Sequence, residues 1–283
     1  KTAGHVGKPA SAVLLRAGGY TAMACAIVMI GLPLLWMLSA AFKQTKEIYI
    51  VPPTWIPQQP TLSNFPNAWH AAPFGRYFFN STLVTVVGAS GKLLNGLICA
   101  YALAFLRFPC KNLVFLIVLA GLMVPPQVTV LPNYLVMGGL GWVNTYQGIV
   151  LPSLATAVGV FLLRQAFLSL PREVIDAARV DGAGHVQVLR DVLIPMARPV
   201  VVTFLLLAVV SEWNEFLWPL VVTSTASMRT LPIGIFWLLD QEGNTQWGVV
   251  MAGTIFVILP LLVIFLLAQR FIVSGIAAGA VKT

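Results

Sequence analysis

Six long apolar stretches constrain the fold of this chain more than any other feature of its sequence. A helix needs about 20 consecutive apolar residues to cross roughly 30 Å of hydrocarbon, because its backbone polar groups must bond to one another inside the segment. The composition, 58% hydrophobic and 9% charged, also lies outside the balance of soluble domains. The sequence therefore predicts an all-α, polytopic membrane protein with six transmembrane helices, at about 18–42, 78–106, 113–137, 149–170, 199–223 and 249–271.

Lysine and arginine indicate how these spans are oriented. Short loops rich in the two residues stay in the cytoplasm, and most of the 17 Lys and Arg residues fall in the set of segments that contains both termini. We therefore predict a cytoplasmic N-terminal segment at 1–17, a six-helix domain at 18–271 and a cytoplasmic tail at 272–283. This topology also accounts for the net charge of +8 without any nucleic acid.

The first apolar stretch follows a basic lead, so a cleaved signal peptide is an alternative to an anchor helix. The apolar core of a signal peptide is typically about 7 to 15 residues long, and the stretch at 18–42 is longer. We therefore expect a retained helix.

The segment 43–77, which this topology places outside the cytoplasm, is rich in proline. Proline lacks the amide donor and fixes φ, so the segment is predicted to run extended with short helical turns. Its aromatic residues suit the membrane interface, and contact with an external delivery protein is the alternative. These residues are Trp55, Phe65, Trp69 and Phe74.

The most informative polar segment is the predicted cytoplasmic loop 171–198. Pro171 suits the first turn of a helix, and Glu173 complements the positive end of its dipole. The helix is predicted to run to about residue 180, after which Gly182 allows a sharp left-handed turn. A second amphipathic piece follows and is predicted to end before Pro195.

One face of the first predicted helix carries mainly small side chains. Val174, Ala177, Ala178 and Asp181 recur at helical spacing and form a slim face that can enter a groove closely. The alternative is a helix lying on lipid headgroups, with its arginines binding anionic lipid. Acidic residues alternate with these arginines, so we favour docking to a soluble protein. The acids are Glu173, Asp176, Asp181 and Asp191.

A recognisable motif lies within this segment: an acidic residue, Ala-Ala, three residues, Gly, and a later Pro after an aliphatic triplet. It resembles the EAA loop of the MalG-like permease subunits of carbohydrate-type (CUT1) bacterial ABC importers, which share the MetI/MalG-like permease fold. The stretches 104–109, 213–220 and 275–282 extend the resemblance over nearly the whole chain. By position, the motif residues here are Asp176, Ala177, Ala178, Gly182 and Pro195.

In such families the loop forms a coupling helix that sits in a groove of the ATP-binding subunit. Asp176 stands where an acid, usually Glu, pairs with a basic residue of the ATPase, so the shorter side chain could weaken or shift that ion pair. The tail residues Gly279 and Lys282 match the terminus that reaches the ATPase dimer interface.

The resemblance implies a permease subunit of an ATP-driven importer in the bacterial cytoplasmic membrane. The implied partners are a homologous second permease subunit, a dimer of ATP-binding subunits and an extracytoplasmic solute-binding protein. ATP and Mg would be bound by the ATPase subunits, so this chain is expected to bind no cofactor and to catalyse no reaction. Sugars, oligosaccharides, polyols and glycerophosphodiesters are all carried by importers of this type, so the solute stays open.

Several polar side chains fall inside the predicted spans. A charge at mid-bilayer costs about 2.5 to 3.5 kcal/mol on insertion scales, so these groups should face a cavity or each other. One interpretation is a hydrophilic translocation path, with Trp213 stacking on a sugar; others are internal ion pairing or a position nearer the interface. The residues are Lys92, Asn95, Glu212, Trp213, Asn214 and Glu215.

Other features restrict the chemistry. Pro125, Pro126 and Pro260 are predicted to kink or break their helices, for gating or for packing. The sequence contains no Cys/His cluster with metal-ligand spacing and no phosphate-loop motif, so neither a metal site nor a catalytic residue is predicted.

Two other functions are weighed against the importer. An ion-coupled secondary transporter or channel would explain the intramembrane charges but not the segment 171–198. An amino-acid or peptide importer is disfavoured by the resemblances at 213–220 and in the tail.

Overall fold

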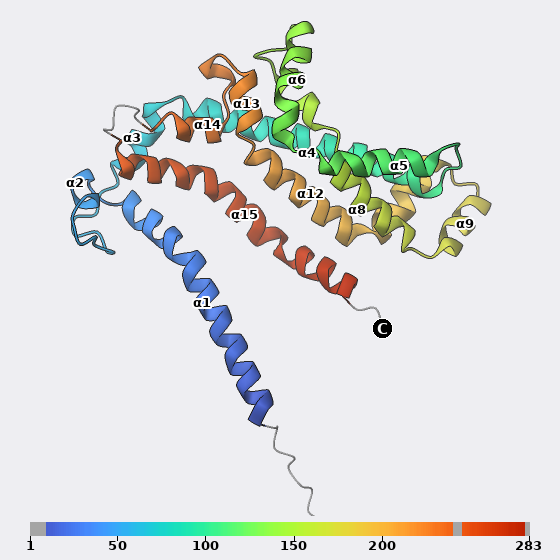
Figure 1. The fold of residues 1–283 in the computed structure, drawn as a ribbon, viewed down its shortest axis with the longest axis horizontal. Coiled ribbons are helices and arrows are strands. Elements are labelled where there is room, and N and C mark those ends of the chain that lie inside the picture. Colours follow the sequence, from blue (N-terminus) through green and yellow to red (C-terminus); the bar gives the residue numbers. More distant parts are fainter. Residues whose placement is uncertain (1–9, 240–244, 281–283) are drawn as a thin grey trace, which may run out of the picture. The chain divides into compact units, whose positions relative to one another are not determined.

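The computed structural model describes the backbone of residues 10–239 and 245–280, and the side chains of 18–239 and 245–269. Within these ranges the chain forms helices and no strand, which confirms the predicted all-α class (Figure 1). The longer helices are α1 (Ala10–Ala41), α3 (Asn64–Ala71), α4 (Phe74–Phe105), α5 (Lys111–Ala120), α6 (Pro126–Gly139), α8 (Ala157–Leu168), α9 (Arg172–Val180), α12 (Arg198–Trp213) and α15 (Trp247–Ala280). The shorter elements are α2 (Thr45–Ile48), η1 (Gly121–Met123), α7 (Tyr146–Val150), η2 (Leu151–Ser153), α10 (His185–Gln187), the π-helical η3 (Val188–Leu193), α11 (Ile194–Met196), α13 (Leu217–Val222), η4 (Ala226–Met228) and α14 (Leu231–Phe236).

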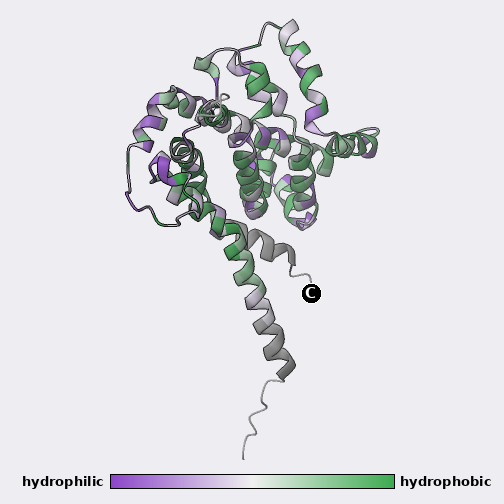
Figure 2. Ribbon diagram, turned by 60° about the vertical axis from the view of Figure 1, so that its left-hand side comes forward, coloured by the Kyte–Doolittle hydropathy of each residue, from purple (hydrophilic) through white to green (hydrophobic). Residues whose placement is uncertain are grey.

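Hydrophobic residues line most of these helices (Figure 2). Three helices are long and apolar enough to cross a membrane: Gly18–Ala41, Phe74–Phe105 and Trp247–Gln269. Three further helix pairs pass the same test only together, and counting each as one span gives up to six among the described residues.

The first of these bends was predicted from Pro125 and Pro126, and the other two were not. The third predicted span breaks by 103° between Lys111–Met123 and Pro126–Gly139, because Pro125 and Pro126 supply no amide donors. The fourth bends by 46° after Tyr146–Ser153.

The fifth predicted span was wrong at its C-terminal end. Helix α12 ends at Trp213, and α13 begins only at Leu217. Pro219 cannot donate to the carbonyl of Glu215, and its ring excludes that carbonyl from a continuous helix. The helix α12 is instead joined at its start to the preceding helix Ile194–Met196, with a bend of 89° between His185–Met196 and Arg198–Trp213.

The chain divides into two compact units. The first contains residues 1–71 and 238–255, and the second contains 72–237 and 256–283. In the first unit, none of the 18 most apolar consecutive residues of α1 is buried, as expected for a helix that faces lipid or another protein.

Buried polar groups fix the segment that follows α1. Lys43 is 0% exposed, lies 4.3 Å from the ring centroid of Trp36, and donates to the carbonyl of Thr54. The Glu47 carboxylate accepts from the backbone N–H of Gln58 at 2.7 Å. This bond is the main cause of a Glu47 pKa below its usual range, and the Thr54 hydroxyl adds to it. The short helical turns that were predicted are present as α2 and α3, and these bonds hold the chain between them in place.

The aromatic residues of 43–77 do not behave alike. Trp55 and Trp69 are 51% and 42% exposed, which suits interface anchors. Phe74 is an exception to the prediction: it is 0% exposed and packs against Tyr77 and Phe256 in the core of the second unit. It is the first residue of α4.

Helix α4 is the centre of the second unit, packed against α8 and α12 (Figure 1). Glycines allow the close approach. A Cβ on Gly159 would lie 2.2 Å from the ring of Phe204, and one on Gly96 would lie 3.1 Å from Leu163. This packing holds a polar cavity near the middle of α4 and the segment 171–198 near its C-terminal end, where Tyr101 contacts His185.

Candidate functional site

Helix α9 is held by a complete Schellman motif at its C-terminal end. Gly182 adopts φ +85°, as the sequence predicted. The Gly182 N–H donates to the carbonyl of Arg179 at 3.1 Å, and the Ala183 N–H donates to the carbonyl of Ala178 at 2.9 Å. A Cβ on Gly182 would meet nothing within 4 Å, so the backbone conformation alone is what favours glycine here.

The start of the helix differs slightly from the prediction. Pro171 is the N-cap, with φ −59° and ψ 128°, rather than a residue of the first turn, and the helix begins at Arg172. Its extended ψ still directs the chain into the helix, and Glu173 lies in the first turn as expected.

Little of α9 is buried against its own chain. Ile175 is 2% exposed and joins a core cluster with Phe167, Val188 and Leu193. Ala178 turns partly toward this cluster, so it contributes less to a free face than the sequence suggested. The remaining predicted docking residues are exposed: Glu173, Val174, Asp176, Ala177, Asp181 and Gly182.

The second half of the segment forms one helical run. The prediction that it ends before Pro195 was wrong: α11 continues to Met196, and the turn comes at Ala197. The physical reason is the π-helical stretch Val188–Leu193, whose wider turn accommodates a residue that has no amide donor. Pro195 itself is exposed.

A polar contact ties this segment to α4. The Tyr101 hydroxyl and His185 Nδ1 are 2.6 Å apart, and the two rings meet edge to face at 5.8 Å. Tyr101 is 5% exposed and packs on Phe105. The junction between α9 and α10 is therefore fixed to the end of a central helix.

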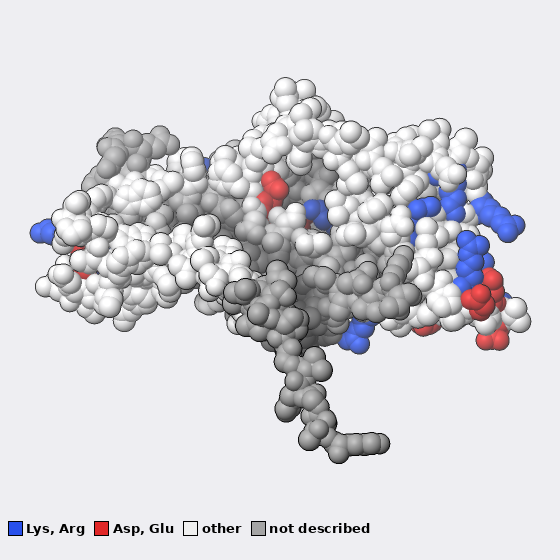
Figure 3. All heavy atoms as spheres, turned by 60° about the horizontal axis from the view of Figure 1, so that its bottom comes forward, with Lys and Arg blue, Asp and Glu red and all other residues white. Residues whose placement is uncertain are grey.

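The charges of the segment largely balance one another. Arg190 donates to Asp191 at 2.7 Å, and this bond lowers the pKa of the Asp191 carboxyl. Asp176 lies 3.9 Å from Arg179, with 70% of its side chain exposed. Figure 3 shows acidic and basic side chains gathered side by side on the right of the view, while most of the remaining described surface in view is uncharged. Mixed charge suits a protein partner better than anionic lipid.

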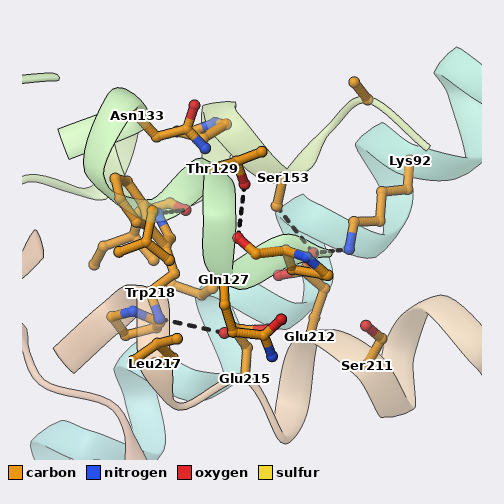
Figure 4. A pocket seen from close by; sticks show the side chains of 17 residues that line it. Lys92, Gln127, Thr129, Asn133, Ser153, Ser211, Glu212, Glu215, Leu217 and Trp218 are labelled. Atoms are coloured by element: carbon orange, nitrogen blue, oxygen red, sulfur yellow. Dashed lines mark hydrogen bonds and ion pairs between the residues drawn. The ribbon is translucent and has the colours of Figure 1, made fainter. Parts of the chain in front are cut away.

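A second candidate site is a cavity of about 390 Å³ in the second unit (Figure 4). Helices α4, α6 and α12 and the segments around η2 and α13 contribute its walls. Its polar and charged lining residues are Lys92, Gln127, Thr129, Asn133, Ser153, Ser211, Glu212 and Glu215, and Leu217 and Trp218 are among the apolar ones.

An ion pair crosses one wall of this cavity. Lys92 Nζ lies 2.5 Å from Glu212 Oε1, and the two side chains are 15% and 4% exposed. Ser153 donates to the same oxygen at 3.0 Å. A Cβ on Gly88 would lie 2.8 Å from Glu212 Cδ, so the glycine leaves room for the carboxylate against α4. The pair that the sequence allowed is formed, and both residues also line the cavity.

Glu215 occupies the break between α12 and α13. Its carboxylate accepts from the backbone N–H of Trp218 at 3.3 Å. The Trp218 indole donates to the carbonyls of Gly148 and Ile149, which fixes the ring in the cavity wall.

Three predicted path residues lie outside the cavity lining. Trp213 is 4% exposed, donates to the carbonyl of Val257 at 2.9 Å and meets Phe78 edge to face, so its ring is not open to a solute here. Asn214 donates to its own helix, at the Val210 carbonyl. Asn95 is exposed on α4.

Sequence reasoning missed much of the cavity wall. Gln127, Thr129 and Asn133 come from α6, and polar residues within an apolar stretch were the available signal. Nothing in the sequence indicated that Trp218 rather than Trp213 would face the cavity, because the break at 214–216 turns α13 away from the line of α12.

The C-terminal tail was a further prediction. Gly279 lies in the last turn of α15, and Lys282 falls outside the described residues. Among the residues that the structure does describe, no group of three His, Cys, Asp or Glu side chains is arranged to hold a metal ion.

Comparison with known proteins identifies the family. Residues 92–277 match the model of the binding-protein-dependent transport system inner membrane component. The chain belongs to this family. Similar relatives include the sn-glycerol-3-phosphate transport system permease protein UgpE of Yersinia enterocolitica, 35% identical over 257 residues, which are 88% of this chain and 92% of the relative. The protein of the same name from Brucella abortus is 32% identical over 266 residues, 91% of this chain and 94% of the relative.

Solved structures show the same fold. A chain in the crystal structure of a bacterial ABC transporter involved in the import of the acidic polysaccharide alginate matches with a TM-score of 0.83 at 21% identity, covering 94% of this chain and 99% of the other. A second alginate transporter structure, in complex with an alginate pentasaccharide-bound periplasmic protein, matches with a TM-score of 0.67 at 14% identity. The chain is thus an inner-membrane permease subunit of an ABC importer, as its resemblance predicted.

Proposed function

We propose that this subunit docks on an ATP-binding subunit through the segment 171–198 and supplies half of the path for a sugar, a polyol or a glycerophosphate compound. The exposed helix α9 is the main support. Ile175 is the buried residue that anchors this helix to the rest of the chain. The helix ends in a hydrogen-bonded Schellman turn, and its exposed face of mainly small residues is free to enter a groove.

The assembly we propose contains a homologous second permease subunit, a dimer of ATP-binding subunits and an extracytoplasmic solute-binding protein. ATP and Mg belong to the ATPase subunits, and this chain contributes no catalytic residue. Both termini face the cytoplasm, and the tail with Gly279 and Lys282 reaches the ATPase dimer. The names of the relatives support the importer and suggest a phosphorylated glycerol compound as one solute class.

The cavity supports a path within the membrane. Its polar groups come from several helices and would be costly to expose to hydrocarbon, so a water-filled space or a polar solute satisfies them. Movement of the docked segment would reach this region through α4 and α12, because His185 is bonded to Tyr101 of α4 and the segment runs directly into α12.

Affinity purification in mild detergent tests the assembly. We expect an ATP-binding subunit and a second permease to co-elute with the wild-type chain, and an Ile175→Asp variant, which loosens α9, to lose the ATP-binding subunit alone. Solute uptake by this chain alone in liposomes, without ATP, would contradict the proposal and favour an ion-coupled transporter.

A further inference from the structure

The charges that line the cavity indicate which class of solute this subunit accepts. Of the described lining residues, Lys92, Glu212 and Glu215 carry ionisable side chains. A phosphate ester needs an available cation or a set of donors directed at its oxygens. The charge that the cavity offers to a solute therefore depends on which of these three side chains already form ion pairs with each other.

Lys92 is engaged. Its ammonium group lies 2.5 Å from Glu212, and the carboxylate is held in place by Ser153 and by the space beside Gly88. Both partners are largely removed from water, and breaking such a pair leaves an uncompensated buried charge. The one cation in the described lining is thus neutralised within the wall.

Glu215 is the remaining charge. Its carboxylate accepts from the Trp218 amide, and its side chain has intermediate exposure. No second Lys or Arg is found in the described part of the lining. The net charge of this wall is therefore negative, which disfavours a phosphate group entering beside it.

The uncharged lining suits hydroxyl groups instead. Gln127, Asn133 and Ser211 offer amide and hydroxyl groups that both donate and accept, and Glu215 can accept from a solute hydroxyl. Leu217, which is 38% exposed, provides an apolar surface beside them for the C–H groups of a pyranose, and the largely buried ring of Trp218, 8% exposed, supports that surface from behind.

From this arrangement we infer that the subunit accepts an uncharged polyhydroxyl solute, a glycoside or polyol, and rejects phosphate esters, although its named relatives belong to sn-glycerol-3-phosphate systems. The inference rests on the proposed path through this cavity. Glu215 is its selective residue: it attracts hydroxyl hydrogens and repels phosphate oxygens.

The test uses the complete importer in proteoliposomes with its solute-binding protein. Initial uptake of maltose, sorbitol and sn-glycerol-3-phosphate is measured at concentrations that load the binding protein equally. We expect the wild type to take up a neutral probe at least tenfold faster than sn-glycerol-3-phosphate. Glu215→Gln should raise the ratio of phosphate ester to neutral uptake about tenfold, and Glu215→Asp, which keeps the charge, should leave that ratio unchanged.

Two results would overturn the inference: wild-type uptake of sn-glycerol-3-phosphate equal to that of the neutral probes, or an identical uptake ratio in wild type and Glu215→Gln. ATP hydrolysis in the same vesicles separates this from the proposed function. An importer that hydrolyses ATP and pumps the phosphate ester refutes the solute class alone, whereas a complex without the ATP-binding subunit refutes the proposed docking.

Discussion

Gly182 gives the sharpest test of how helix α9 is held, because its cost on substitution can be assigned to one cause. The residue has φ +85°, and a Cβ there would meet no atom within 4 Å. Steric overlap is therefore absent, and the whole penalty is that of a side chain in the left-handed region, about 1 to 2 kcal/mol. A change of this size shifts the ratio of turned to unturned conformations by a factor of about 5 to 30.

The matched pair of variants is Gly182→Val and Gly182→Asn. Valine is β-branched and tolerates the left-handed region poorly, whereas asparagine adopts it readily. We expect both variants to insert and assemble in the membrane. Solute-stimulated ATP hydrolysis by the reconstituted importer should fall in Gly182→Val, by up to about 30-fold, which is the limit set by that ratio, and stay near wild type in Gly182→Asn.

Two outcomes would contradict this role of Gly182. Normal stimulated turnover in Gly182→Val would show that the Schellman turn does not present α9 to the motor. Equal loss in Gly182→Asn would show that side-chain volume, not backbone conformation, sets the requirement, and that a partner surface must approach closer than the free space around Gly182 indicates.

Three further predictions concern stability. Lys92→Met should destabilise the detergent-solubilised protein by about 3 to 5 kcal/mol, because it leaves Glu212 buried and unpaired; a thermal melt should show most of the loss restored in Lys92→Met/Glu212→Gln, and no restoration would contradict a direct pair. Gly159→Ala should cost about 1 to 3 kcal/mol by overpacking against Phe204, and the same melt should show recovery on adding Phe204→Leu. Because the folded-state pKa of Glu47 is lowered, its stabilisation is present above the ordinary carboxyl pKa of about 4.3 and is lost as the pH falls through the lower folded value. Tryptophan fluorescence of the wild type should therefore report loosening of the first unit at acidic pH, and Glu47→Gln should remove that dependence; an unchanged acid transition would contradict it.

Patterns that depend on local chemistry could be predicted from the sequence. The apolar stretches gave the helical membrane class, and the acid-Ala-Ala-Gly spacing gave α9 and its left-handed turn at Gly182. Both follow from short-range rules: backbone satisfaction in hydrocarbon, and the freedom of glycine at positive φ. Proline likewise predicted the break at Pro125, whereas Pro260, for which a kink or break was also predicted, lies inside the unbroken helix α15.

Features that depend on tertiary packing could not be predicted. Pro195 lies inside a helical run because a π-helical stretch precedes it, and such a stretch leaves no clear trace in sequence. Trp213 and Trp218 are equally plausible cavity residues by composition, but the break after α12 sends the first into the core and the second to the cavity wall. Phe74 was assigned to the interface because aromatic character alone does not distinguish an anchor from a core residue.

Site-specific photo-crosslinking from α9 reports directly whether this helix docks on the ATP-binding subunit. A photoreactive amino acid at Val174, which is 41% exposed, is activated in the assembled importer in membranes, with the same label at exposed Leu116 of α5, 59% exposed, as the lipid-facing control. We expect a nucleotide-sensitive crosslink from position 174 to the ATP-binding subunit and none from position 116. Crosslinks from position 174 to lipid alone would contradict this docking.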